Sequence, residues 1–388
     1  MNQTCLFVVN GLGLGNSTRC YAVMENLAEA GFRIHVLTSG NGLSYFADKK
    51  CLESLTSMES FYYSGKNGGV SGWSTLRSLK SLAAIAKAKR SQLSALLDRL
   101  DPDVAVVDSE YTLAPLRRRG IPTIAINTSE MVVSEYLKHR NVPGSVRSHF
   151  WLVEFSDYLF HKHFCDLVLS PFPLRTKTRG PKFRRVGLIV RRAVLEHAQR
   201  GVGHGFSPRS IRTVVFMLSG SVHASHISFD REMPFKVEVV GRSGESRRNV
   251  IYHGRQLNNV ELLNRADALV INGGYSAVSE AFVLGKPVFV IPVKGHAEQF
   301  VNASLVSELG LGFVADETNV VDKLVQMYEQ DRWIGATALQ GPFQIDGARE
   351  ACSAISTHLR TRSTRSNRLT QPMVVTQLRE KGAEQGSC

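Results

Sequence analysis

A glycine pair at the start of a predicted helix opens the segment of this chain that is best equipped for chemistry. Gly273 and Gly274 follow a short apolar strand, and Ser276 and Glu280 lie in the first turns of the helix. Paired glycines at a helix N-terminus let backbone N–H groups approach a pyrophosphate, and the Ser276 hydroxyl adds a donor. The Glu280 carboxylate can accept hydrogen bonds from both hydroxyls of a ribose. Its competing role is compensation of the helix dipole, worth about 0.3–1 kcal/mol.

A second polar group follows the next predicted strand. His296, Glu298 and Gln299 lie in a loop that enters another helix. We expect Glu298 and Gln299 to hold hydroxyls of a hexose, and His296 to contact the same donor. The alternative is an ordinary polar helix start. Together the two groups predict a pocket for a sugar carried on a nucleotide.

A glycine-rich loop near the N-terminus, residues 11–16, joins the first predicted strand to the first helix. Gly13 and Gly15 let a ligand approach the backbone at a helix N-terminus. A dinucleotide cofactor would need a third glycine where Asn16 stands, and an acid at the end of the second strand, which ends in Thr-Ser-Gly. The sequence therefore disfavours a nicotinamide or flavin cofactor. A tight turn that needs glycine is the structural alternative.

Short apolar strands alternate with amphipathic helices, which is typical of βαβ units and a parallel sheet. The predicted strands are Leu6–Val9, Ile34–Thr38, Val104–Val107 and Thr123–Ile126 in the first half, and Thr213–Leu218, Phe235–Val240, Val250–His253, Ala268–Ile271 and Pro287–Ile291 in the second. A chain of 388 residues suits two domains. We expect an N-terminal Rossmann-like domain at 1–172, a basic linker at 173–192, a second Rossmann-like domain at 193–360 and a basic, disordered tail at 361–388.

Composition narrows the class of protein. The chain is 43% hydrophobic and 21% charged, as soluble globular proteins are. No run approaches the ~20 apolar residues that cross a bilayer, and no signal peptide is recognisable. Six scattered cysteines without a CxxC pair argue against a zinc site or a disulfide framework and fit a reducing compartment. We expect a cytoplasmic protein, with peripheral attachment to the inner face of the membrane as an option that the net charge of +13 leaves open.

The second-half motifs resemble the donor-binding signature of GT-B glycosyltransferases, the family 28 and family 1 group that includes MurG and the UDP-glycosyltransferases. Ser219-Gly220-Ser221 is similar to the second glycine motif of these enzymes, and residues 11–15 with Arg19 look like their N-terminal acceptor-side loop. The main matching string is Gly273-Gly274-Tyr275-Ser276…Glu280…Gly285-Lys286-Pro287…Pro292…Glu298-Gln299…Asn302-Ala303.

The resemblance implies an α/β fold of the GT-B type, in which two Rossmann-like domains with parallel sheets face each other across a cleft. The second domain would bind a UDP-sugar and the first would present the acceptor, which is a lipid carrier, a glycan or a small molecule. The implied reaction moves a hexose or N-acetylhexosamine to an acceptor hydroxyl, with inversion, without metal and without a cofactor besides the donor.

The general base departs from the family pattern. Related enzymes often carry histidine in the N-terminal loop, where this chain has Asn16, and an amide is no base near pH 7. Asp108, just past a predicted strand and close to Glu110, is the first alternative, because α/β sites assemble at the carboxyl ends of strands. Asp108 could instead cap a helix. The second alternative is an acceptor acidic enough to need little help, and the third is a protein that binds donor without turnover.

Other assignments stay open at this point. A UDP-sugar 2-epimerase shares the fold, and a non-catalytic nucleotide-sugar-binding subunit would share the pocket. The basic amphipathic segment 76–97 packs on the core or lies on an anionic membrane. The aromatic segment 145–164 packs in the core or, if exposed, forms a groove for a lipid acceptor. No motif supports specific binding of nucleic acid.

Overall fold

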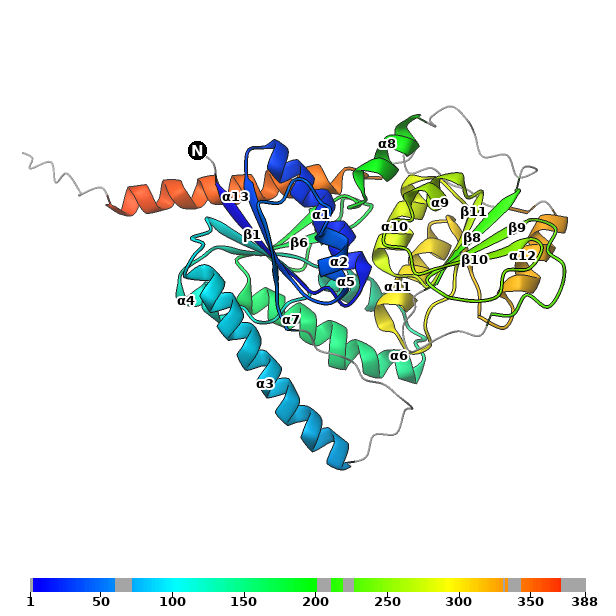
Figure 1. Cartoon of the computed structure of the whole chain (residues 1–388), viewed down its shortest axis with the longest axis horizontal. Helices are drawn as coiled ribbons and strands as arrows, with labels where there is room; N and C mark the ends of the chain where they lie inside the picture. Colours follow the sequence, from blue (N-terminus) through cyan, green and yellow to red (C-terminus); the bar gives the residue numbers. More distant parts are fainter. Residues whose placement is uncertain are drawn as a thin grey trace, which may run out of the picture.

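The computed structural model describes residues 3–59, 72–200, 211–218, 227–330, 332–333 and 343–370. It arranges them in two lobes that lie side by side (Figure 1). Each lobe is built around one parallel β-sheet, as the alternating pattern of strands and helices predicts.

The first sheet has seven parallel strands in the order β3-β2-β1-β4-β5-β6-β7. Their side chains alternate between the two faces: Cys5, Phe7 and Val9 of β1 join one core cluster, and Leu6 and Val8 join another. Since the order reverses between β1 and β4, the loops after these two strands lie where α/β folds bind ligands. The strands are β1 (Thr4–Val9), β2 (Arg33–Thr38), β3 (Ser54–Ser57), β4 (Val104–Asp108), β5 (Thr123–Ile126), β6 (Leu167–Pro171) and β7 (Phe183–Val186).

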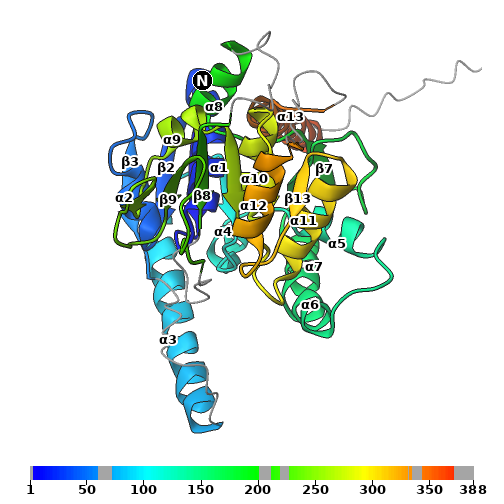
Figure 2. The same ribbon diagram turned by 90° about the vertical axis from the view of Figure 1, so that its right-hand side faces the viewer.

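Helices cover both faces of this sheet. In Figures 1 and 2, α3 extends away from the rest of the molecule. Its C-terminal half is anchored by the buried Leu93, Leu96 and Leu97, so the segment packs on the core there. The helices are α1 (Leu14–Glu29), α2 (Asn41–Phe46), α3 (Gly72–Leu97), α4 (Ala114–Arg118), α5 (Ser129–Tyr136), α6 (Gly144–His149), the π-helical turn η1 (Phe150–Glu154) and α7 (Phe155–Phe164).

The aromatic segment divides between core and surface. Phe150 and Tyr158 are buried, whereas Trp151 is 49% and Phe164 41% exposed. None of the described helices is long and apolar enough to cross a membrane.

The second sheet has six parallel strands in the order β10-β9-β8-β11-β12-β13, which reverses between β8 and β11. An apolar contact joins the two domains, because Met131 and Phe172 of the first face Val278 and Phe282 of the second. The elements are β8 (Thr213–Met217), β9 (Lys236–Val240), β10 (Val250–Gly254), β11 (Ala268–Ile271), β12 (Val288–Val290), β13 (Gly312–Val314), α8 (Arg192–Arg200), α9 (Val260–Arg265), α10 (Tyr275–Val283), α11 (Ala297–Glu308) and α12 (Val320–Glu329).

The domain boundaries differ from the predicted ones in two places. Residues 173–192 are more than a linker, because they include β7, which pairs with β6 at the edge of the first sheet. The last helix, α13 (Gly347–Thr370), returns to the first domain, where Ala351, Ile355 and Leu359 join the core beneath α1 (Figure 1). It also runs ten residues into the predicted tail at 361–388, so a disordered tail is wrong for residues 361–370.

Candidate functional site

A cavity of about 610 Å³ is lined by residues from both domains. The first domain contributes the loop after β1 and the start of α1, and the second contributes the starts of α10 and α11. The predicted site residues that line it are Gly13, Gly15, Asn16, Gly274, Ser276, Glu280, Glu298 and Gln299. The structure thus brings the N-terminal glycine loop next to the second glycine loop, Glu280 and Glu298, although the two regions lie far apart in the sequence.

Other predicted residues lie elsewhere. Asp108, Gly273 and His296 are not among the residues that line the cavity. Ser219, Gly220 and Ser221 fall outside the described residues.

The loop after β11 has the geometry that its glycines predict. Gly273 has φ +81°, and a Cβ atom there would stand 2.8 Å from Cγ1 of Val290. The Asn302 side chain donates a 2.9 Å hydrogen bond to the Gly273 carbonyl and fixes this turn. Gly274 then precedes the first residue of α10, Tyr275. The N-terminus of α10 therefore borders the cavity.

Lys286 of the family motif has a structural position. Its ammonium group donates to the carbonyls of Leu263 at 2.7 Å and Asn264 at 2.6 Å, and also to that of Ala266. These carbonyls end α9, where a cation is stabilising. Lys286 therefore stabilises the C-terminus of α9 and does not bind a ligand.

Glu280 is buried and oriented by an arginine that the sequence did not single out. Arg191 Nε donates to Glu280 Oε1 and its Nη2 donates to Oε2, both at 2.7 Å. Arg191 Nη2 also donates to Asn259 Oδ1 at 2.8 Å. All three side chains line the cavity. The two-pronged contact holds the carboxylate in one orientation at the cavity wall.

Glu298 and Gln299 lie at the start of α11. The Glu298 carboxylate accepts a hydrogen bond from the backbone of Tyr275, so it caps α10 while facing the cavity. Burial raises the pKa of Glu298, and the nearby Arg19 guanidinium offsets only part of this shift. Gln299 Oε1 accepts from the backbone N–H of Val293 at 2.8 Å, which fixes the amide in the loop.

Asp108 lies behind the cavity wall. It is fully buried, and Arg19 donates to both of its oxygens at 2.9 and 2.7 Å. Ser109 follows at φ +51° and donates its hydroxyl to Asp108 Oδ1 at 3.2 Å. A general base must lie within hydrogen-bond reach of the proton that it removes. This geometry disfavours Asp108 as the base and favours a positioning role for it through Arg19, which does line the cavity.

Asn16 belongs to the same arrangement. Its Oδ1 accepts a 3.3 Å hydrogen bond from Arg19 Nη2, and its Nδ2 donates to the Asn10 carbonyl at 3.3 Å. The side chain therefore supports the Arg19 guanidinium from the position where the family often carries histidine. Nearby Glu110 is also buried and pairs with Lys89 at 2.6 Å.

A buried polar cluster on α7 was not predicted from the sequence. Asp157 accepts hydrogen bonds from the Tyr111 hydroxyl and the Asn127 amide, both at 2.8 Å. His161 Nδ1 lies 3.1 Å from Asp157 Oδ1. Although burial lowers the pKa of His161, its hydrogen bond to Asp157 raises it overall. The spacing of Asp157 and His161, four residues apart on a helix, is the one sequence signal that could have revealed the pair.

The chain is similar to known glycosyltransferases. A family model for glycosyl transferase family 1 matches residues 3–151 and 200–329. A protein of Methanosarcina acetivorans described as an uncharacterized glycosyltransferase is 30% identical over 338 residues, which cover 79% of this chain and 84% of that protein.

Solved glycosyltransferases share the fold. The spinosyn forosaminyltransferase SpnP has a TM-score of 0.58 at 15% identity, covering 94% of this chain and 100% of that chain. MurG of Acinetobacter baumannii has a TM-score of 0.53 at 13% identity, covering 92% and 99%. The glycosyltransferase VinC, solved in complex with dTDP, has a TM-score of 0.52 at 13% identity, covering 95% and 99%.

The predicted GT-B fold, with its two parallel-sheet Rossmann-like domains, is confirmed by these structures and by the two sheets. The family match spans both domains and most of the described chain. This chain is therefore a glycosyltransferase that belongs to glycosyl transferase family 1.

Proposed function

We propose that this glycosyltransferase moves a hexose or N-acetylhexosamine from a UDP-sugar to an acceptor hydroxyl, in one inverting displacement without metal at the donor. The observation that carries the proposal is the position of Glu280. Its carboxylate lines the same cavity as the N-terminus of α10 and is held there by Arg191. The two hydroxyls of a ribose can donate hydrogen bonds to the two oxygens of one carboxylate, and a diphosphate accepts hydrogen bonds from backbone N–H groups. This cavity offers both kinds of partner.

The charge of the cavity supports a diphosphate as the leaving group. Arg19, Arg191 and Arg255 line it, together with the helix N-terminus. Fixed cations and N–H dipoles stabilise the negative charge that develops on a departing diphosphate, because they need no reorganisation during the reaction. Glu298 and Gln299 border the same cavity, where we assign them to the hexose hydroxyls.

The lining also bears on the acceptor. Among the described lining residues the titratable carboxylates are Glu280 and Glu298, and there is no histidine. Asp108 is screened by Arg19. These contacts favour an acceptor hydroxyl that is itself acidic, such as a phenol, because such a group needs less help from a base.

Two measurements test the proposal. Calorimetric titration of the full chain with UDP, dTDP and GDP should give the tightest binding for UDP. The dTDP arm matters, because VinC was solved with that nucleotide. A nucleotide-release assay should then show turnover of a UDP-sugar, faster with phenolic than with alkyl acceptors.

Each of the other outcomes would indicate a different function for this chain. Isomerisation of a free UDP-sugar without acceptor would identify a 2-epimerase, and binding without turnover would identify a binding subunit. A folded chain that binds no nucleoside diphosphate would overturn the proposal itself.

A further inference from the structure

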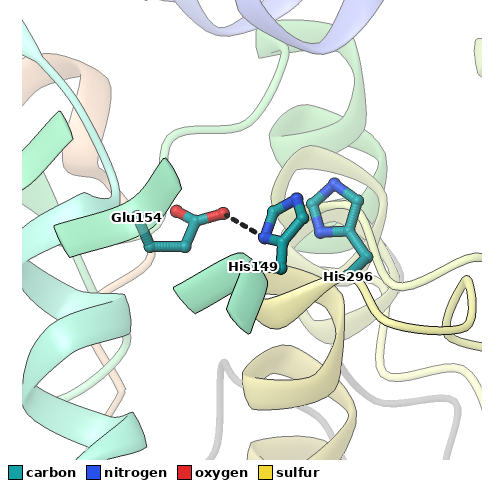
Figure 3. Close-up of side chains that lie close together, drawn as sticks. All are labelled: His149, Glu154 and His296. Carbon is teal, nitrogen blue, oxygen red and sulfur yellow. Dashed lines mark ion pairs between the residues drawn. The ribbon is translucent and has the colours of Figure 1, made fainter. Parts of the chain in front are cut away.

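Two histidines and a glutamate from both domains lie together beside the start of α11 (Figure 3). His149 is the last residue of α6 and Glu154 the last of η1, so both belong to the first domain. His296 precedes α11 in the second domain. None of the three is among the residues that line the donor cavity. The family resemblance gives this trio no role as a group, and Figure 3 shows the two rings beside each other with Glu154 facing His149.

The spacing of the three side chains suits a metal ion. One ligand atom from each residue lies within 4.8 Å of the others. His149 Nδ1 and Glu154 Oε1 are 3.7 Å apart, and the two imidazole centroids are 4.7 Å apart. Ligands bound to one zinc ion at 2.0–2.2 Å stand about 3.3–3.6 Å from each other in a tetrahedron. Small side-chain rotations therefore suffice to close the set.

The Nδ1 atoms of His149 and His296 each accept a long hydrogen bond from a backbone N–H group. The backbone N–H of Ala297 donates to His149 Nδ1 at 3.4 Å, and that of Gln299 donates to His296 Nδ1 at 3.5 Å. A neutral imidazole accepts at its unprotonated nitrogen, which is also the atom that binds a metal. Both hydrogen bonds are long, so a metal ion would replace weak contacts.

The surroundings favour a cation. Glu154 is 8% exposed and lies near the carboxylates of Glu298 and Asp157. A divalent ion would compensate the negative charge on this side of the cluster, because buried charges need a partner or a metal ion.

We propose that His149, Glu154 and His296 bind one divalent transition-metal ion between the two domains, with zinc as the best fit. Two imidazoles and one carboxylate form a nitrogen and oxygen set that suits zinc, and a water molecule completes the tetrahedron. Because the ligands come from both domains, the ion links α6 and η1 to α11 and stabilises their contact. The proposal does not rest on UDP as the donor.

The sequence could not suggest this site. The three ligands come from two segments of the chain that are separated by more than a hundred residues. Only the packing of α11 against α6 and η1 brings the three residues together.

The test uses tag-free full-length protein freed of metal by a chelator. Calorimetry with Zn²⁺ should show one site per chain, and Mg²⁺ should show none. Three variants should each weaken zinc binding at least tenfold: His149→Gln, Glu154→Gln and His296→Asn. The last keeps a good N-cap for α11 while removing the imidazole. His163→Gln, which changes an exposed histidine on α7, is the matched control and should bind zinc as the wild type does.

Two further readouts keep the test decisive. Zn²⁺ should raise the Tm of the wild type and of His163→Gln but not that of the three variants, whose circular dichroism should match the wild type. Co²⁺ should give the absorption of a tetrahedral nitrogen and oxygen site in the wild type and in His163→Gln, but in none of the three variants. Wild-type protein that binds no Zn²⁺, or variants that bind it equally well, would overturn the proposal.

Discussion

The ion pairs Arg19–Asp108 and Arg191–Glu280 have the same geometry but present different groups to the donor cavity. Each arginine donates two hydrogen bonds of 2.7–2.9 Å to a buried carboxylate that lies 89 residues further along the chain. In the first pair only the arginine lines the donor cavity, whereas in the second both partners line it.

This difference shows that the position of the paired arginine determines whether a carboxylate faces the cavity. Asp108 directs its oxygens to Arg19 inside the domain, so what reaches the cavity is a cation. Glu280 stands at the wall with its partner, so an incoming ribose can compete for its oxygens. Two acids that look equally functional in the sequence therefore differ: Asp108 is held inside the domain, whereas Glu280 lies at the cavity wall, where the proposed function gives it a binding role.

The largest expected effect is on stability, from Asp108→Ala. The substitution leaves the Arg19 guanidinium buried without its partner, which should lower the free energy of unfolding by about 3–5 kcal/mol. Urea denaturation followed by circular dichroism measures it. The double variant Arg19→Met with Asp108→Ala is the control, and it should recover part of the loss because no unpaired charge remains.

A small loss of stability in Asp108→Ala would contradict the structural role of this pair. Asp108→Asn sharpens the same point by keeping the shape of the side chain. If that variant folds normally, binds nucleotide and keeps its full rate of turnover, Asp108 is not the base.

The next effect is on binding, from Glu280→Gln. Loss of the carboxylate charge should weaken UDP binding by about 10–100-fold, equivalent to about 1.4–2.8 kcal/mol. Its cost in stability should be smaller than that of Asp108→Ala, because the glutamine side-chain oxygen can still accept one hydrogen bond from Arg191. Calorimetry gives the first quantity and urea denaturation the second. Glu261→Gln, an exposed glutamate on α9, should change neither.

The sequence predicted the secondary-structure elements better than the contacts between side chains. Glycine loops, strands and the acid of α10 carry local signals, so the alternating α/β pattern and part of the cavity lining could be predicted from spacing, and the family resemblance implied the GT-B arrangement. Arg191 carries no such local signal, because its contact with Glu280 joins two residues that are 89 positions apart in the chain. The same limit hid the Arg19 contact of Asp108 and the return of α13 to the first domain.

A third carboxylate, Glu238 on β9, gives the comparison a reference that is remote from the cavity. Burial alone would raise its pKa, but hydrogen bonds from Arg265, Lys236 and His253 lower it from 4.5 to about 2. A lowered folded-state pKa adds stability above the unfolded value, and this stability disappears as the pH falls through the folded one.

Glu238→Gln should therefore lower the free energy of unfolding at pH 7 by about 1–3 kcal/mol. The difference from wild type should shrink between pH 4.5 and about 2. Denaturation across this range measures it, and nucleotide binding at pH 7 should stay unchanged. A difference that stays constant with pH would show that the loss comes from packing and not from charge.

The smallest effect concerns the contact between the two glycine loops. Ser276 donates its hydroxyl to the Gly15 carbonyl at 3.1 Å, which ties the start of α10 to the start of α1. Ser276→Ala should lower the free energy of unfolding by about 0.5–1.5 kcal/mol, the net value of one hydrogen bond. Because the hydroxyl already serves Gly15, UDP binding should weaken by no more than about threefold, or about 0.7 kcal/mol. A loss of tenfold or more in calorimetry would mean that the hydroxyl leaves Gly15 for the diphosphate, and that the donor rearranges the contact between the domains when it binds.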